Sequence, residues 1–340
     1  MTEPRLALAM TMGEPAGIGG EIALLAWRQR AAKVPPFYLI DDPCRLAALA
    51  EGLGWPVPVR PIGAPEEARG IFPEALPVLP VGPAIKGRPA RPDPVDAPAI
   101  TGAIARAVRD VQDGRAAAVV TNPIHKDSLY RAGFRHPGHT EFLAELAGVA
   151  APVMMLACPE LRVVPVTIHL SLRQAIESLS TAAIVHAGRV TEAALRRDFG
   201  IASPVLAVAG LNPHAGEAGS LGREDIDIVA PAVAALRAAG IDARGPLPAD
   251  TMFHSEARRH YHAALGMYHD QALIPIKTID FHGGVNVTLG LPFVRTSPDH
   301  GTAFDIAGTG TARPDSLLAA LRLAAEMAAR RQAAETAHPG

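Results

Sequence analysis

The stretch "AALGMYHDQALIPIK", residues 263–277, decides the fold class of this chain. It begins with an apolar run of strand length, is interrupted by His269 and Asp270, and continues with a second apolar run that ends at Lys277. A short apolar run bounded by polar residues is typical of a buried strand. We therefore predict that a strand ends at His269 and that Asp270 begins the next element.

The same alternation recurs along the chain. Three other apolar runs have strand length, at residues 6–10, 116–120 and 204–210. Helical patterns, with apolar residues three and four positions apart, occupy residues 100–112, 182–199 and 225–240 and the segment after Pro314. Strands that alternate with helices predict an α/β fold with mostly parallel sheets. One exception is residues 152–170, which look like two adjacent strands of a hairpin.

The composition excludes several classes of partner. The chain has 340 residues, long enough for two lobes with a ligand cleft. Its 32 Lys and Arg against 34 Asp and Glu, with 4% aromatic residues, argue against nucleic acid or an anionic membrane. The two cysteines, Cys44 and Cys158, predict neither a disulfide framework nor a cysteine zinc site. With no export signal or membrane-spanning run, we expect a cytoplasmic protein.

Histidines follow several of the predicted strands. His125, His169, His214 and His269 each come directly after an apolar run or within a few residues of its end. In α/β sheets, ligands bind beyond the carboxyl ends of the strands. A single histidine there is most often a hydrogen-bonded structural residue. If the sheet brings His169, His214 and His269 to one edge, however, the three imidazoles can hold a divalent ion and leave positions open for a substrate.

Two further groups of polar residues suggest anion binding. His139 and Thr140 precede an amphipathic helix, where they form either an ordinary N-cap or an anion site. Arg295 follows an apolar strand and is a natural clamp for carboxylate or phosphate, although a surface arginine is the commoner case. The glycines at residues 13–20 do not form the G-x-G-x-x-G dinucleotide fingerprint, so a tight turn explains them equally well.

Long ordered motifs carry a family resemblance. They are "GEPAGIGGE", "TNPIHK", "GHTEF", "GLNPHAGEAG", "LPADTMF", "MYHDQALIPIK" and "GVNVTLGLPFVRTSPDHGTAFDIAG". Together they closely resemble the PdxA family, the 4-hydroxythreonine-4-phosphate dehydrogenases of pyridoxal phosphate biosynthesis. The segment "DHGTAFDIAGTG" is also similar to the cofactor loop of isocitrate and isopropylmalate dehydrogenases. The resemblance runs from about the first predicted strand to the last predicted helix.

The resemblance implies a fold and a set of site residues. The fold is two α/β/α domains with a cleft between them, residues 1–125 with 296–340 on the cofactor side and residues 126–295 on the metal and substrate side. The active unit is a homodimer with its active site at the subunit interface. One divalent metal (Zn, Mg, Co or Mn) is expected on His169, His214 and His269. The substrate positions are His139, Thr140, Lys277, Asn286 and Arg295, and those for NAD or NADP are Asn212, His300, Gly301, Thr302 and Asp305.

The implied reaction is oxidation of 4-phosphooxy-L-threonine to a β-keto acid, which loses carbon dioxide to give 3-amino-2-oxopropyl phosphate. Asp250, Asp270 and Lys277 are candidates for the base that takes the hydroxyl proton. The alternatives are a dehydrogenase of a related phosphorylated hydroxy acid such as 4-phospho-threonate, or of an aromatic dihydrodiol. A metal-dependent hydrolase and a non-catalytic two-lobed binding protein are more distant alternatives.

Overall fold

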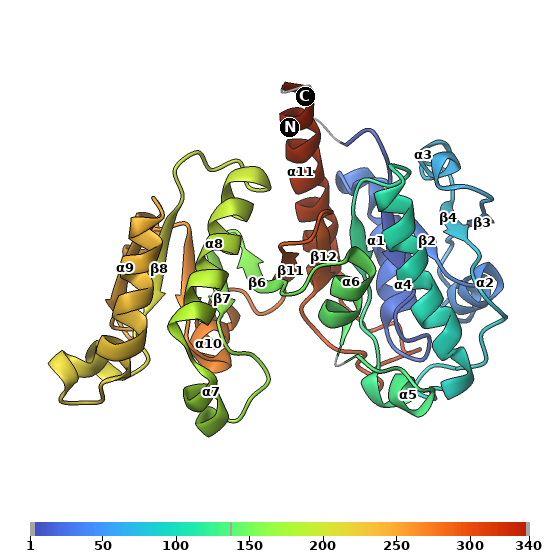
Figure 1. Ribbon diagram of the computed structural model, residues 1–340. Helices are drawn as coiled ribbons and strands as arrows, with labels where there is room; N and C mark the ends of the chain where they lie inside the picture. The colour runs from blue at the N-terminus through green and yellow to red at the C-terminus, as the bar shows by residue number, and fades with distance from the viewer. Residues whose placement is uncertain (1–3, 137, 338–340) are drawn as a thin grey trace. The chain divides into compact units, whose positions relative to one another are not determined.

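The computed structural model describes residues 4–136 and 138–337 and divides the chain into two compact units (Figure 1). The first unit comprises Met1–Ala151 and Leu291–Gly340, and the second comprises Pro152–Gly290. The sequence predicts boundaries at 125/126 and 295/296 instead. Residues 126–151 belong to the first unit because Leu129 and Leu143 pack into its core, where Leu291 and Phe293 also lie.

The first unit is built on parallel strands in the order β3-β4-β2-β1-β5-β12. Its strands are β1 (Leu8–Thr11), β2 (Phe37–Ile40), β3 (Val59–Pro61), β4 (Leu76–Leu79), β5 (Val119–Thr121) and β12 (Arg295–Pro298). Its helices are α1 (Gly19–Arg28), α2 (Pro43–Gly52), α3 (Ala68–Ile71), α4 (Ala97–Gln112), α5 (Lys126–Arg131), α6 (His139–Ala147) and α11 (Asp315–Ala337).

Helices cover both faces of these strands. Ala7 and Ala9 belong to the core cluster that contains the buried face of α4. Leu8 and Met10 are also fully buried and, because side chains alternate along a strand, face the opposite side. The strands β12, β5 and β1 also contact α11. The first unit is therefore an α/β/α layer structure, as the uninterrupted apolar runs predict.

The second unit has strands in the order β11-β6-β7-β10-β8-β9. They are β6 (Val153–Cys158), β7 (Leu161–Pro165), β8 (Val205–Ala209), β9 (Asp242–Leu247), β10 (Ala263–Gly266) and β11 (Val285–Leu289). Its helices are α7 (Leu172–Ser178), α8 (Thr181–Arg197), α9 (Ala230–Ala238) and α10 (His269–Ile279). The pairs β7/β10, β10/β8 and β8/β9 are parallel, whereas β6 is antiparallel to both β7 and β11. The predicted hairpin at residues 152–170 is thus confirmed.

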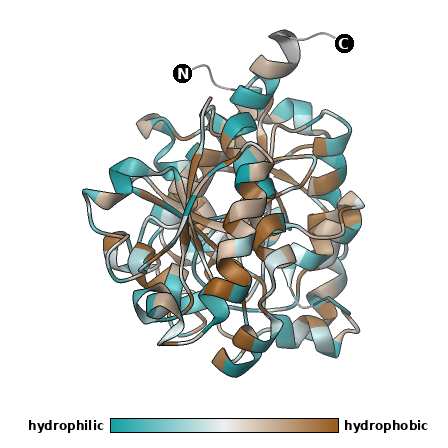
Figure 2. Cartoon of the chain, turned by 60° about the vertical axis from the view of Figure 1, so that its left-hand side comes forward, coloured by the Kyte–Doolittle hydropathy of each residue, from teal (hydrophilic) through white to brown (hydrophobic). Residues whose placement is uncertain are grey.

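The second unit also has helices on both faces of its strands. Helix α10 contacts β7 and β10, and its Ala272 and Ile276 join the core cluster of Val163, Ala207 and Ala264. Helices α8 and α9 pack on each other and on other parts of the sheet. Hydrophobic residues, brown in Figure 2, recur along the strands. The predicted α/β class with mostly parallel strands is confirmed.

Two further features concern the cysteines and the apolar character of the helices. Cys44 is exposed and Cys158 is buried, and both are free thiols. Within residues 4–136 and 138–337, no helix combines the length and the apolar character needed to cross a membrane.

Candidate functional site

Three neighbouring strands of the second unit bring the predicted metal-ligating histidines to one edge. The strands β7, β10 and β8 are adjacent and parallel, so their carboxyl ends point the same way. His169, His269 and His214 follow these strands in that order. The sheet topology therefore supports the prediction that residues far apart in sequence meet at this edge.

His169 and His269 lie close together. Their ring centroids are 5.7 Å apart. His269 Nδ1 lies 2.7 Å from Asp270 Oδ1, a hydrogen bond that fixes the ring and leaves Nε2 for a ligand. No side chain caps α10, whose N-cap residue is Tyr268. Asp270 therefore orients an imidazole and does not cap the helix.

His214 lies on an unusual left-handed segment. The short helical segment η4 (Pro213–Gly219) has positive φ angles throughout residues 214–218, between 45° and 80°. Each residue other than glycine costs about 1–2 kcal/mol in this conformation. The His214 side chain is 63% exposed, and its Nδ1 lies 3.6 Å from Glu217 Oε1. Strain of this kind is held only where surrounding contacts determine it, and it is common at functional sites.

Asp225 supplies the contacts that hold the segment. It is buried at the start of η5 (Asp225–Val229), and its carboxylate accepts hydrogen bonds from the backbone N–H groups of Leu211 and Asn212, at 2.7 and 3.0 Å. The Asn212 side-chain amide donates to Asp225 Oδ2 and to Glu224 Oε2. Asn212, a predicted cofactor residue, is thus part of a network that fixes the chain just before His214.

The donor set suits a divalent metal, although a closed site is not formed. Among the described residues, no group of three or more His, Cys, Asp or Glu side chains is arranged to hold an ion. The structure pairs His169 with His269 and places His214 on the loop after the neighbouring strand β8. Imidazoles, one of them oriented by a carboxylate, are ordinary ligands for zinc, cobalt or nickel.

In the first unit, Arg295 is the centre of a candidate anion-binding group. It begins β12 and is only 3% exposed, and its Nη2 donates to Thr121 Oγ1 at the end of β5, at 2.6 Å. Burial lowers the pKa of Arg295 to about 10, so the guanidinium stays protonated at neutral pH. A buried positive charge at a strand end is a strong attraction for phosphate or carboxylate.

His139 and Lys126 belong to the same group. His139 is the first residue of α6, whose N-cap is Gly138 and has no side-chain cap, so the N-cap expectation for His139 and Thr140 is wrong. Its Nε2 is buried and has no hydrogen-bond partner within the described residues. Burial and the charges of Arg295 and Lys126 lower the pKa of His139 well below its usual value. An anion would satisfy this nitrogen and the helix N-terminus together.

The predicted cofactor loop, residues 299–310, lies against the turn between β1 and α1. The Thr302 carbonyl accepts a hydrogen bond from the Ile18 N–H at 3.0 Å. The rings of His125 and Phe304 contact each other, with centroids 4.9 Å apart. His300 Nδ1 lies 3.1 Å from the Gly301 carbonyl oxygen. Gly301 and Asp305 are exposed, so this loop has an accessible side.

The remaining predicted residues lie in the second unit. Lys277 is partly buried near the end of α10, with Nζ 5.3 Å from the centre of the Phe281 ring. Asn286 lies on β11, and its Oδ1 is buried without a hydrogen-bond partner in the described structure. Asp250 is exposed in the loop after β9. These positions leave their predicted roles as proposals.

Three supporting residues were not predicted. Thr121 and Lys126 stand in the quoted motif "TNPIHK", directly after a predicted strand, and that position could have indicated them. Asp225 gave no such signal, because its role depends on a backbone conformation that the sequence does not reveal.

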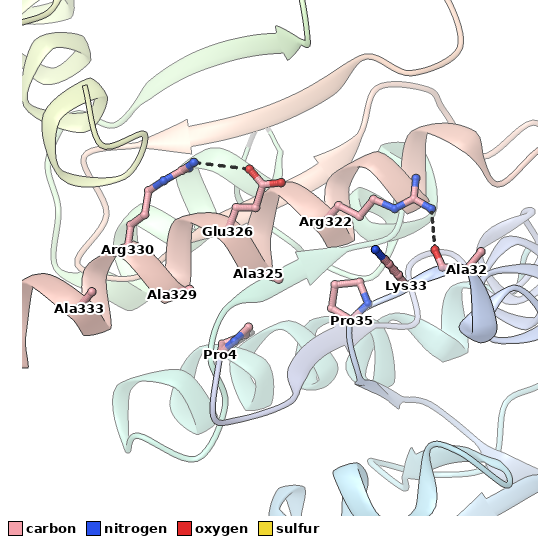
Figure 3. A pocket seen from close by; sticks show the side chains of 10 residues that line it. All are labelled: Pro4, Ala32, Lys33, Pro35, Arg322, Ala325, Glu326, Ala329, Arg330 and Ala333. Carbon is pink, nitrogen blue, oxygen red and sulfur yellow. Dashed lines mark hydrogen bonds and ion pairs between the residues drawn. The ribbon is translucent and has the colours of Figure 1, made fainter. Parts of the chain in front are cut away.

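A surface pocket of about 550 Å³ lies elsewhere on the first unit (Figure 3). Helix α11 contributes Arg322, Glu326 and Arg330 to its wall. Arg330 forms an ion pair with Glu326 at 3.7 Å, and Arg322 donates to the Ala32 carbonyl at 3.4 Å. No predicted site residue lines this pocket.

These features define an α/β protein with histidines after the strands of one unit and a candidate anion-binding group around the buried Arg295 in the other. The family model described as "Pyridoxal phosphate biosynthetic protein PdxA" matches residues 33–324. The chain belongs to the PdxA family. A relative from Bradyrhizobium diazoefficiens, named 4-hydroxythreonine-4-phosphate dehydrogenase, is 58% identical over 335 residues, which cover 95% of this chain and 97% of the relative.

The chain is also similar to solved structures. A 4-hydroxythreonine-4-phosphate dehydrogenase from Klebsiella pneumoniae matches with a TM-score of 0.84 and 38% identity, covering 95% of this chain and 99% of the other. A terephthalate 1,2-cis-dihydrodiol dehydrogenase from Burkholderia xenovorans matches with a TM-score of 0.64 and 30% identity, covering 94% and 98%.

Proposed function

We propose that this protein oxidises 4-phosphooxy-L-threonine with NAD or NADP, and that the β-keto acid formed loses carbon dioxide to give 3-amino-2-oxopropyl phosphate, in pyridoxal phosphate biosynthesis. The observation that carries the proposal is the 58% identity, over nearly the whole of both chains, to a relative named for this activity. We place the enzyme in the cytoplasm, since free thiols suit a reducing compartment.

The anion-binding group supports a phosphorylated substrate. Arg295 and Lys126 supply positive charge, and the N-terminus of α6 offers backbone N–H groups. His139 is neutral at neutral pH and can donate or accept through its buried Nε2. We propose that the substrate phosphate or carboxylate binds this group, with Thr140 on the same helix turn. Lys277 and Asn286 would contact other polar groups of the substrate.

We propose that His169, His214 and His269 hold one divalent metal (Zn, Mg, Co or Mn). When bound, such an ion lowers the pKa of the substrate alcohol and stabilises negative charge during decarboxylation. Asp270 would keep the His269 ring in the ligating orientation. The Asp225 network would keep the His214 loop in place.

We propose that residues 299–310 bind the nicotinamide cofactor, through His300, Gly301, Thr302 and Asp305, with Asn212 as a further contact. NAD or NADP accepts the hydride from the alcohol carbon. The hydroxyl proton must pass to a base, for which Asp250, Asp270 and Lys277 are candidates. The hydrogen bond of Asp270 to His269 supports an orienting role for Asp270 and favours the other two as the base.

We also propose a homodimer with the active site at the subunit interface. Seven of the nine exposed large apolar side chains among the described residues belong to the second unit and follow the predicted metal ligands in sequence: Leu170, Leu172 and Ile176 after His169, Leu221 and Ile226 after His214, and Ile274 and Phe281 after His269. Exposed apolar groups of this kind mark interaction surfaces. A partner that covers them would also exclude water from the reaction. A monomer in analytical ultracentrifugation at assay concentrations would contradict this part of the proposal.

The activity test is a change in NAD(P)H absorbance with a panel of phosphorylated hydroxy acids, using metal-free protein to which metals are restored one at a time. We expect 4-phosphooxy-L-threonine to give the highest kcat/KM, and we expect His169→Ala, His214→Ala and His269→Ala to lose metal-dependent turnover. Full turnover by all three variants without metal would contradict the metal proposal.

A second candidate activity deserves the same panel. The structural match to a dihydrodiol dehydrogenase makes oxidation of an aromatic dihydrodiol the main competitor. The buried charge of Arg295 favours an anionic substrate. Activity with phosphorylated acids such as 4-phospho-threonate, compared with activity on carboxylated dihydrodiols, separates the two candidates. A metal-dependent hydrolase would consume substrate without any change in NAD(P)H absorbance.

A further inference from the structure

We infer that Glu21, on the first turn of α1, is a positioning residue that holds the cofactor loop, residues 299–310, in its binding conformation. This inference rests on the proposed NAD(P) dependence. Glu21 is 1% exposed. Its Oε1 accepts a hydrogen bond from the Gly308 N–H, and its Oε2 accepts one from the Gly310 N–H at 3.1 Å. One carboxylate thus joins residues that are almost 290 positions apart.

The backbone of the loop explains why a carboxylate is needed. Gly308 and Gly310 both have left-handed φ angles, of 80° and 73°. With this backbone, the N–H groups of Gly308 and Gly310 point to the same carboxylate, as in backbone anion-binding turns. A Cβ atom at Gly308 would lie 2.7 Å from Pro89 Cβ, so the loop is also packed closely from outside. A charged acceptor binds such N–H groups more strongly than a neutral one.

The turn before Glu21 holds the other end of the loop. The Ile18 N–H donates to the Thr302 carbonyl at 3.0 Å. A Cβ atom at Gly17 would lie 2.8 Å from the same oxygen, so only glycine allows this approach. Residues 17–21 therefore fasten the loop near both of its ends.

The loop has exposed positions beside and between these two anchors. Around Gly301, just before the first anchor, an added Cβ would meet nothing within 4 Å. Asp305, between the anchors, is exposed, whereas Ala307 is buried. A loop that is fixed near both ends and keeps exposed positions is ready to receive a ligand without paying for its own ordering. Gly17 of "GEPAGIGGE" thus serves the contact with this loop.

The test compares wild type with Glu21→Ala and Glu21→Gln. Calorimetry gives the Kd for NAD and for NADP, and hydrogen exchange gives the opening of residues 302–310 without cofactor. We expect Glu21→Ala to raise the cofactor Kd by ~10-fold or more and to speed exchange of the Gly308 and Gly310 amides. Glu21→Gln keeps one acceptor oxygen and should be intermediate. At saturating cofactor, kcat and the KM for the phosphorylated substrate should stay within about twofold of wild type.

A matched control is Asp110→Asn in the same unit. Asp110 is also a buried carboxylate, but it accepts from the Tyr38 hydroxyl and from Arg106, at 2.8 Å each. This variant should lose stability and keep the wild-type cofactor Kd.

Different results would contradict the proposed cofactor and the proposed role of Glu21. Wild-type protein that binds neither NAD nor NADP would overturn the proposed cofactor, and loop exchange would then decide the role of Glu21 by itself. If Glu21→Ala shows the same amide exchange rates in residues 302–310 and the same cofactor Kd as wild type, the inference is overturned. If Glu21→Ala does not fold, the same comparison with Glu21→Gln decides it.

Discussion

His269 and Asp270 are consecutive residues whose side chains bind each other, with Nδ1 2.7 Å from Oδ1. Consecutive residues at the start of a helix usually point in different directions. Here both residues lie in the first turn of α10, which begins at His269, three residues after β10 ends at Gly266, so the carboxylate lies beside the imidazole. The polar interruption in "AALGMYHDQALIPIK" is thus a histidine together with the group that orients it.

From this pair we predict that Asp270→Asn weakens metal binding. The amide cannot supply the negative charge that raises the basicity of His269, and loss of such a partner typically costs 10- to 100-fold in affinity, roughly the range we expect. Titration calorimetry with zinc or cobalt measures the metal affinity of the variant and of wild type. The control is Asp227→Asn, which removes an exposed carboxylate of the same unit that pairs only with Arg223 in the described structure. Equal metal affinity in both variants would contradict the orienting role.

We predict that Arg295→Ala raises the KM for the phosphorylated substrate by ~10-fold to 100-fold. A hydrogen bond between charged groups contributes about 1.5–3 kcal/mol, and the variant loses that interaction with the anion. Arg295→Lys keeps the positive charge and should therefore recover part of the affinity for the phosphorylated substrate. The recovery should be incomplete, because lysine lacks the planar fork of the guanidinium. Steady-state kinetics with the NAD(P) concentration varied separately should show little change in cofactor affinity. Arg322→Ala, in the surface pocket on α11, is the control and should behave as wild type.

We predict that His139 makes stability fall in mildly acidic solution. Its pKa in the folded protein lies well below 6.5, because of burial and the charges of Arg295 and Lys126. As the pH falls below about 6.5, the unfolded chain therefore binds a proton that the folded protein does not, and stability drops by up to about 1.4 kcal/mol per pH unit. The free energy of unfolding stops falling once the pH is below the pKa of His139 in the folded protein. His139→Gln should have a flatter profile between pH 7 and 5 in urea unfolding.

We predict that Asp225→Ala lowers the free energy of unfolding by about 1–3 kcal/mol, because the N–H groups of Leu211 and Asn212 lose their acceptor in a buried place. The left-handed residues 214–218 would then be free to relax, so metal affinity should fall as well. Asp227→Ala, two residues further on, removes an exposed ion pair and should change stability by less than about 0.5 kcal/mol. Similar unfolding curves for the two variants would show that Asp225 is not the anchor.

Sequence patterns predicted the fold class because it depends on local apolar runs, and they placed the strand ends to within a few residues. The strand predicted to end at His269 ends at Gly266, and the next helix begins at His269 and not at Asp270. The edge that carries His169, His214 and His269 follows from the strand ends and the sheet order. The left-handed backbone at residues 214–218 could not be predicted, since four of its five residues avoid that conformation and the hydrogen bonds of Asp225 that fix the preceding residues depend on the folded structure.

Other features depend on contacts between distant segments. The hydrogen bond from Arg295 to Thr121 joins residues 174 positions apart, and its formation requires β12 to lie beside β5. The division into compact units differs from the predicted boundary at 125/126 for a similar reason: the apolar side chains of α5 and α6 pack into one core with α4, which precedes that boundary. Pattern and spacing indicate candidate elements but not which core they join.

The discontinuous first unit has a consequence for the order of assembly during synthesis. Residues 152–290 form a continuous unit, whereas the first unit also needs Leu291–Gly340. Until β12 emerges from the ribosome, β5 has only β1 as a neighbour and Thr121 lacks Arg295. The histidine edge can therefore take shape on a nascent chain before Arg295 reaches Thr121, so the proposed metal site can form earlier during synthesis than the proposed phosphate site.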